Sequence, residues 1–148
     1  MIVPDTNLLV CATYRESPHH AKAWKWLETT LNGDEPVGLP WASVCGFLRI
    51  STNHRIMPSP WSIHDAMRTV DEWFARRNVV AIEAGERHWE IFRALIAEAG
   101  RGGNLTTDAH LAALCNERGA TLHSADGDFS RFRGLRWENP IAHSSSAS

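Results

Sequence analysis

Short apolar runs alternate along the chain with longer stretches in which apolar residues recur at helical spacing. Runs with the length and residue types of β-strands span residues 1–3, 37–41, 79–82 and 120–125, and the run at 135–137 predicts a strand at the sheet edge. The stretches between them predict helices over residues 8–12, 18–31, 42–50, 63–75, 86–99 and 108–118.

Strands that alternate with helices predict an α/β fold, in which a mostly parallel sheet is covered by helices on both faces. Ligands of such sheets bind beyond the carboxyl ends of the strands. The sequence contains no visible internal repeat or second domain. We therefore expect one domain over residues 1–140, followed by a disordered tail over residues 141–148.

Polar residues mark the starts of two predicted helices. Ser17-Pro18 resembles an N-cap followed by proline at the first helical position, and Ser62 with Asp65 resembles a capping box. The chain has seven tryptophans, more than a core of this size needs. We expect Trp73 and Trp89 in the core, and others could line a groove that accepts an amphipathic helix of a partner.

Composition narrows the class of protein. The 148 residues suffice for a sizeable core, and three cysteines in apolar stretches indicate reduced thiols rather than a disulfide framework. The start of the chain has no basic leader, and no apolar run has the length of a membrane span, so we expect a soluble cytoplasmic protein without a membrane partner. Only two of the fifteen basic residues are lysines. Arginine suits phosphate contacts, although a GC-rich genome produces the same bias.

Three aspartates are the candidate catalytic residues. Asp5 ends the first predicted strand, Asp126 follows the fourth, and Asp108 opens a helix after a glycine-rich loop. All three could converge at one edge of the sheet, where Mg²⁺ or Mn²⁺ would offset their mutual repulsion and activate a water molecule. From position alone, a turn residue or a helix N-cap is the commoner role for each of them.

Other aspartate-based sites fit the chain less well. A haloacid-dehalogenase-type phosphatase needs a second aspartate at position 7, which is Asn7. A receiver domain needs a lysine at the end of a late strand, and no lysine follows Lys25. A P-loop is excluded because the sequence Gly-Lys-Ser/Thr does not occur. Asp128 remains ambiguous, since Asp126-Gly127-Asp128 could simply be a turn.

Three segments together resemble the PIN-domain ribonucleases, specifically VapC-type toxins of VapBC toxin-antitoxin systems. They are Val3-Pro4-Asp5-Thr6-Asn7-Leu8-Leu9-Val10, Thr107-Asp108-Ala109-His110-Leu111 and Ser124-Ala125-Asp126-Gly127-Asp128-Phe129. The resemblance implies a three-layer α/β/α sandwich and a toxin that is a Mg²⁺- or Mn²⁺-dependent endoribonuclease. It also implies RNA as substrate, a cognate antitoxin as partner, and a homodimer or a larger assembly with that antitoxin.

The resemblance assigns Asp5, Asp108 and Asp126 to three of the family's four acidic positions. Gly46 occupies the remaining one, the second along the chain, where the family has a glutamate. We therefore expect Asp5, Asp108 and Asp126 to hold the metal, with water filling the gap. Gly46→Glu should add a carboxylate that tightens metal binding, and should stabilise its helix if the side chain is not forced into a packed contact.

A second interpretation remains open at this point. Without the glutamate, the chain could be a non-catalytic PIN-like module that binds RNA or a protein partner. Three arginines after Asp126 could contact the RNA backbone or simply be exposed charges: Arg131, Arg133 and Arg136.

Overall fold

A computed structural model describes residues 1–142, which form a five-stranded parallel sheet with the strand order β3-β2-β1-β4-β5. The strands are β1 (Ile2–Pro4), β2 (Val37–Pro40), β3 (Val79–Ile82), β4 (Thr121–His123) and β5 (Arg136–Glu138). The helices are α1 (Thr6–Thr13), α2 (His20–Leu31), α3 (Trp41–Ser51), α4 (Ile63–Phe74), α5 (His88–Ala99), α6 (Leu105–Arg118) and the 3₁₀-helix η1 (Gly127–Arg131).

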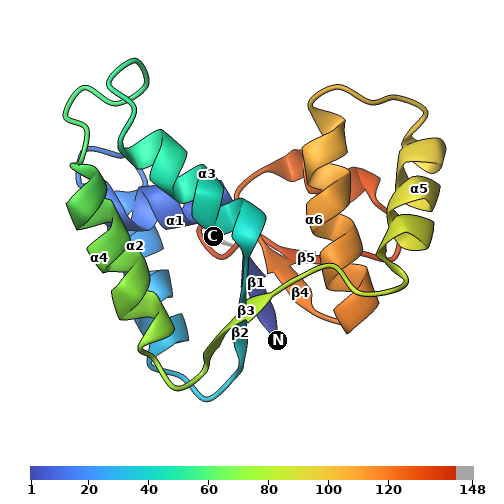
Figure 1. Ribbon diagram of the computed structural model, residues 1–148, viewed down its shortest axis with the longest axis horizontal. Coiled ribbons are helices and arrows are strands. Elements are labelled where there is room, and N and C mark those ends of the chain that lie inside the picture. Colours follow the sequence, from blue (N-terminus) through green and yellow to red (C-terminus); the bar gives the residue numbers. More distant parts are fainter. Residues whose placement is uncertain (143–148) are drawn as a thin grey trace, which may run out of the picture.

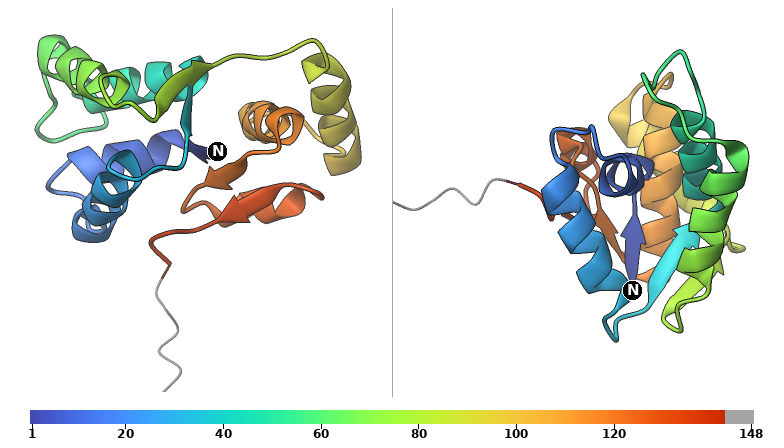
Figure 2. Two further views of the ribbon diagram at one scale, coloured as in Figure 1. Left: turned by 90° about the horizontal axis from the view of Figure 1, so that it is seen from below. Right: turned by 90° about the vertical axis from the view of Figure 1, so that its left-hand side faces the viewer.

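The helices lie in two layers. Figure 1 shows α1 to α4 on one side of the sheet and α5 and α6 on the other. On the first side, α1 lies between α2 and α3, as the right-hand view of Figure 2 shows. The predicted three-layer α/β/α sandwich with a parallel sheet is therefore confirmed.

Each face of the sheet has its own hydrophobic core. Leu8, Leu27 and Phe47 belong to the core under α1 to α4, whereas Leu95, Leu114 and Phe129 belong to the core under α5, α6 and η1. All four residues of β2 are buried, as expected for a central parallel strand that is covered on both faces. The edge strands β3 and β5 leave half or more of their residues partly or fully exposed.

The strand order reverses direction next to β1. The chain adds β2 and β3 on one side of β1, and then crosses to add β4 and β5 on the other side. In open parallel sheets, ligands bind beyond the carboxyl ends of the strands at such a reversal. The fold therefore directs attention to the ends of β1 and β4.

Two helix starts differ from the prediction. Helix α2 begins at His20 rather than after Ser17, because Ser17 forms a preceding turn in which its carbonyl accepts the backbone N–H of His20. Helix α6 begins at Leu105, so Asp108 is the fourth residue of its first turn and does not open it. The predicted cap of α4 is confirmed, since the Ser62 side chain accepts the backbone N–H of Asp65.

The predictions for tryptophans and cysteines are only partly correct. Trp73 is buried as expected, but the expected core position of Trp89 is wrong, because its side chain is 66% exposed on α5 and Leu95 faces the core instead. Cys115 is buried, Cys11 is half-buried and Cys45 is exposed; all three are free thiols.

The predicted tail begins inside the folded part of the chain. Ile141 is buried in the core under α1 to α4, and residues 143–148 lie outside the described residues. None of the helices in residues 1–142 is long and apolar enough to cross a membrane.

Candidate active site at the carboxyl edge of the sheet

Asp5 and Asp126 lie at the point where the strand order reverses. Asp5 directly follows β1, and its backbone N–H donates to the carbonyl of His123 at the end of β4, at 2.9 Å. Asp126 is the third residue after β4 and caps η1, where its Oδ1 accepts the backbone N–H of Asp128 at 2.9 Å. The sheet thus brings together two carboxylates that are 121 positions apart in the sequence.

A buried serine joins these two aspartates. The Ser124 hydroxyl donates to Asp5 Oδ2 at 2.8 Å and accepts the backbone N–H of Asp126 at 3.0 Å. The other oxygen of Asp5, Oδ1, accepts the backbone N–H of Thr6 at 2.8 Å. Both oxygens of Asp5 are therefore held in place, and sequence reasoning did not identify Ser124 as a residue of the site.

The carboxylates interact electrostatically. Burial raises the pKa of Asp5, and repulsion from Asp126 adds to this effect, whereas the hydrogen bonds from Ser124 and Thr6 oppose it. Burial, together with repulsion from Asp126, Asp5 and Asp128, raises the pKa of Asp108 to about 6. Asp108 on α6 therefore lies close enough to the other three carboxylates to interact with them electrostatically.

The donor set fits a hard divalent cation. All the groups are carboxylates, and their mutual repulsion is relieved when a cation binds among them. Within residues 1–142, no three side chains of His, Cys, Asp or Glu are close enough together to hold one metal ion. Mg²⁺ is commonly bound by one or two carboxylates together with water and a phosphate, so two of these aspartates would suffice as its protein ligands.

Ser124→Ala should weaken the site without removing a charge. The substitution leaves Asp5 Oδ2 and the backbone N–H of Asp126 without their shared partner. We expect the free energy of unfolding to fall by about 1–3 kcal/mol and the pKa of Asp5 to rise further. Chemical denaturation and NMR titration of the carboxyl carbon measure both effects. Ser130→Ala, at an exposed position of η1, is the control, and an unchanged pKa of Asp5 would contradict the assigned role.

Gly46 lies beside the site but has no room for a side chain. A Cβ atom at this position of α3 would be 2.7 Å from Oγ1 and 2.8 Å from Cγ2 of Thr6, the residue that follows Asp5. The expectation that Gly46→Glu stabilises α3 therefore fails, because it required an uncrowded position. The contact also shows that α3 passes the site, as the family pattern implies.

Gly46→Ala should lower the free energy of unfolding by about 1–3 kcal/mol, which outweighs the gain of up to about 1 kcal/mol in helix propensity. Thr6 is β-branched and stiff, so it cannot easily move away. In a Thr6→Ala background the two shortest contacts are absent and the Cβ of residue 6, at 3.3 Å, remains, so Gly46→Ala should destabilise the protein less there. Urea denaturation of the four proteins measures the difference. Stabilisation of the otherwise unchanged chain by Gly46→Ala would contradict this contact.

The three arginines after Asp126 have partners within the protein. Arg131 pairs with Asp128 at 3.8 Å, Arg133 pairs with Glu98 at 3.4 Å, and Arg136 donates to the carbonyl of Gly119 at 3.5 Å. Arg131 belongs to η1, which Asp126 caps, and is therefore the one nearest in sequence to the site. These contacts favour exposed, locally paired charges over a prepared phosphate site.

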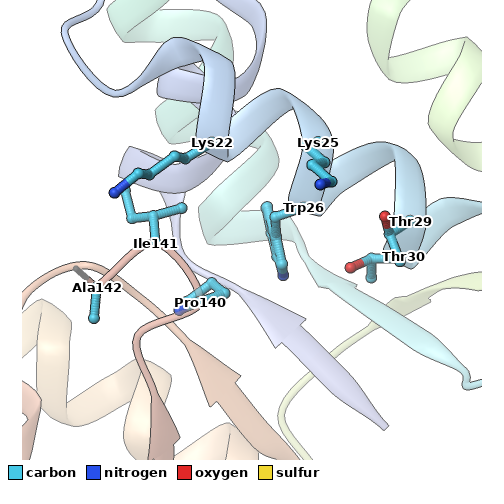
Figure 3. A pocket seen from close by; sticks show the side chains of 8 residues that line it. All are labelled: Lys22, Lys25, Trp26, Thr29, Thr30, Pro140, Ile141 and Ala142. Carbon is cyan, nitrogen blue, oxygen red and sulfur yellow. The ribbon is translucent and has the colours of Figure 1, made fainter. Parts of the chain in front are cut away.

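A separate cavity of about 330 Å³ lies between α2 and the segment at residues 140–142 (Figure 3). None of the three candidate aspartates lines it. Its Trp26 donates from Nε1 to His123 Nδ1 at 2.9 Å, and His123 Nε2 lies 3.4 Å from Glu138. The cavity therefore abuts the strand that precedes Ser124, but it is distinct from the acidic cluster.

Comparison with known proteins gives one consistent family. The model of the PIN domain matches residues 2–135. Ribonuclease VapC33 of Mycobacterium tuberculosis is 41% identical to the chain over 141 residues, which are 95% of this chain and 99% of that protein.

Solved structures agree at the level of the fold. VapBC2 from Rickettsia felis, bound to a DNA fragment from its promoter, superposes with a TM-score of 0.68 at 17% identity and covers 94% of this chain and 98% of the other. A toxin-antitoxin complex from Klebsiella pneumoniae has a TM-score of 0.64 at 16% identity, with 95% and 98% covered.

Proposed function

Because the chain belongs to the PIN-domain family, we propose that it is a VapC-type toxin that cleaves RNA as a Mg²⁺- or Mn²⁺-dependent endoribonuclease in the cytoplasm. The observation that carries this proposal is the cluster of Asp5, Asp108 and Asp126 at the strand-order reversal. The name of VapC33, a ribonuclease that matches nearly the whole chain, supports RNA as the substrate.

The residues of the cluster have different roles in this proposal. Asp5 and Asp126 hold the cation from the ends of neighbouring strands, and Asp108 completes the acidic surface from α6. When bound, Mg²⁺ or Mn²⁺ lowers the pKa of a water molecule and stabilises the negative charge that develops at the phosphodiester. Ser124 keeps the Asp5 carboxylate in one orientation, and the backbone N–H of Thr6 fixes its second oxygen.

Purified protein incubated with RNA tests the proposal directly. Cleavage should require Mg²⁺ or Mn²⁺, stop with EDTA and return when the cation is restored. Sequencing of the RNA ends identifies the sites that are cut. RNA that remains intact at all cation concentrations, in the presence of tight RNA binding, would instead favour the non-catalytic PIN-like module.

A groove of about 380 Å³ supports an antitoxin as the protein partner. It lies between the end of α1, α2 and α4, and three tryptophans line it, from α2, from the loop before α4 and from α4: Trp24, Trp61 and Trp73. Trp24 is 52% exposed, and the rim carries the charged residues Arg15 and Glu72. We propose that an amphipathic segment of the cognate antitoxin binds here, and the toxin-antitoxin complex from Klebsiella pneumoniae supports a partner of this kind.

Trp24→Ala tests the antitoxin groove. The substitution should weaken binding of the protein encoded beside this one by roughly tenfold or more, because truncation of a central aromatic anchor commonly costs about 2 kcal/mol or more. Calorimetry gives the dissociation constant, and light scattering shows whether the complex contains one or two copies of this chain. Trp89→Ala is the control, since Trp89 lies on α5, outside the groove. Unchanged affinity of Trp24→Ala would place the antitoxin elsewhere.

A further inference from the structure

A second cavity opens at the same edge of the sheet as the aspartates. Its volume is about 340 Å³, and three elements enclose it: the start of α3, the segment after β3, and α6. The residues that line it, here called the Trp41 pocket, are Trp41, Ala42, Ile82, Glu83, Ala84, His110 and Leu114.

The Trp41 pocket is connected to the acidic cluster through two of these elements. On α3, the Ser43 hydroxyl donates to the carbonyl of Pro4, the residue before Asp5, at 3.1 Å. On α6, His110 lies about half a turn after Asp108, so the two side chains leave the same helix on different faces. Strands β3 and β1 are separated only by β2, so the ends of these strands are about 10 Å apart. A chain bound at the aspartates therefore reaches the pocket.

Trp41 offers a flat aromatic surface at the mouth of this pocket. Its side chain is 48% exposed although it is the first residue of α3, in the bend that follows the buried strand β2. The indole packs against Phe74 with ring centroids 5.8 Å apart, and its Nε1 donates to Glu83 at 3.4 Å. The ring is thus held from one side and open to solvent on another, as in sites where aromatic side chains stack on nucleobases.

Two residues that line the pocket, Glu83 and His110, carry hydrogen-bonding groups. His110 Nδ1 is 2.9 Å from His88 Nε2, and the other nitrogen of His88, Nδ1, is buried and has no hydrogen-bond partner within residues 1–142. A buried lone pair costs less than a buried unpaired N–H, so we assign the proton of His88 to Nε2. His110 then accepts at Nδ1 and carries its own proton on Nε2. The pocket therefore contains a donor on His110 and an acceptor on Glu83.

The charge of the pocket favours the base of a nucleotide over its phosphate. No Lys or Arg occurs among the lining residues that the structure describes, and Glu83 would repel a phosphate. A neutral planar ring with donor and acceptor groups on its edge is favoured instead. The carboxylate of Glu83 can accept a hydrogen bond from an N–H group on the edge of such a base.

We propose that the Trp41 pocket binds a base of the RNA substrate next to the cleaved phosphodiester, and so contributes to the choice of cleavage site. Trp41 stacks on the base, while Glu83 and His110 contact its edge. This inference rests on the proposed function, since it takes single-stranded RNA as the substrate of the neighbouring aspartates.

Binding is measured separately from cleavage so that the two proposals can fail independently. The Asp5→Asn protein is titrated into fluorescein-labelled oligoribonucleotides of about eight nucleotides, one each of A, C, G and U, and anisotropy gives the dissociation constants. Adding Trp41→Ala should weaken binding about tenfold, in line with the loss of one base stack. Trp41→Phe should retain most of the affinity, and Trp89→Ala should retain all of it.

The outcomes distinguish the explanations. Equal RNA affinity with and without Trp41→Ala overturns the pocket, whether or not the protein cleaves RNA. A change in oligomeric state with unchanged RNA affinity also overturns it and identifies this face as a contact between copies of the chain. If the protein does not cleave RNA but Trp41→Ala weakens RNA binding, the pocket proposal is supported and the nuclease proposal fails.

Glu83→Gln separates base reading from stacking. This substitution keeps the shape of the side chain but replaces one acceptor oxygen by a donor. It should change the order of affinities among the four oligoribonucleotides, whereas Trp41→Ala should lower all four. An unchanged order would show that Glu83 does not contact the base.

Discussion

Asp5→Asn should abolish RNA cleavage and growth inhibition while leaving the fold intact. The variant loses the negative charge at the end of β1, which the proposed cation needs, and keeps the shape of the side chain. We expect the cleavage rate to fall about 10³-fold or more, as is usual when a central catalytic group is removed. Cleavage of labelled RNA by purified protein, and colony counts after induced expression, measure the two effects.

The local hydrogen bonds explain why this variant should still fold. The carbonyl oxygen of the new amide side chain can accept the backbone N–H of Thr6, and its NH₂ group can donate to the Ser124 hydroxyl, which has two lone pairs. Because burial raises the pKa of Asp5, its charge is costly in the folded protein, and the neutral amide should maintain or increase thermal stability. An active variant, or an inactive one that is unfolded by circular dichroism, would contradict this account.

The same change at the other two aspartates tests whether they act as one unit. Asp108→Asn and Asp126→Asn should each cause a large loss of cleavage, but a double variant should be little worse than Asp5→Asn alone. Asp128→Asn is the matched comparison, because Asp128 is exposed and pairs with Arg131. It should have a smaller effect. Losses that multiply would indicate that the aspartates act separately.

The fold could be predicted from the sequence because its signals are local. Strands β1, β2 and β3 are short apolar runs, and β3 begins and ends where its four apolar residues do. Errors occur where tertiary contacts override a local pattern. Trp89 has the spacing of an inward residue on α5, but Leu95 occupies the core and the indole remains exposed.

The candidate site could be predicted only in part, because its residues meet across the sheet. The positions of Asp5 and Asp126 follow from the rule that ligands bind at the ends of parallel strands. Ser124 was missed because its role depends on two hydrogen bonds, one of them to a residue 119 positions away. Its place two residues before Asp126 was the one signal available. The crowding between Gly46 and Thr6 depends on how α3 packs against α1, which no sequence pattern reveals.

Stability should depend on pH through Asp108. Its pKa is about 6 in the folded protein, above the ordinary value of 3.8, so folding favours the protonated form. The contribution of Asp108 to the free energy of unfolding is therefore fully present below about pH 3.8 and is lost as the pH rises to about 6. Asp108→Asn should raise the free energy of unfolding at pH 7 by on the order of 1 kcal/mol, because solvent screens part of the repulsion at this half-buried carboxyl.

The affinity for Mg²⁺ should rise with pH as Asp108 loses its proton, whereas the free energy of unfolding falls. A protonated Asp108 cannot contribute its charge, so a cation and a proton compete for the cluster below about pH 6. We expect the affinity for Mg²⁺ at pH 5 to be about tenfold lower than at pH 7. At pH 5, one unit below the pKa, only about one Asp108 side chain in ten is deprotonated, so the cation must usually displace a proton. Calorimetric titration with Mg²⁺ in EDTA-treated protein measures this ratio. In Asp108→Asn the affinity should be lower at pH 7 and nearly the same at both pH values. An equally steep pH dependence in that variant would assign the competing proton to another carboxyl and remove Asp108 from the metal site.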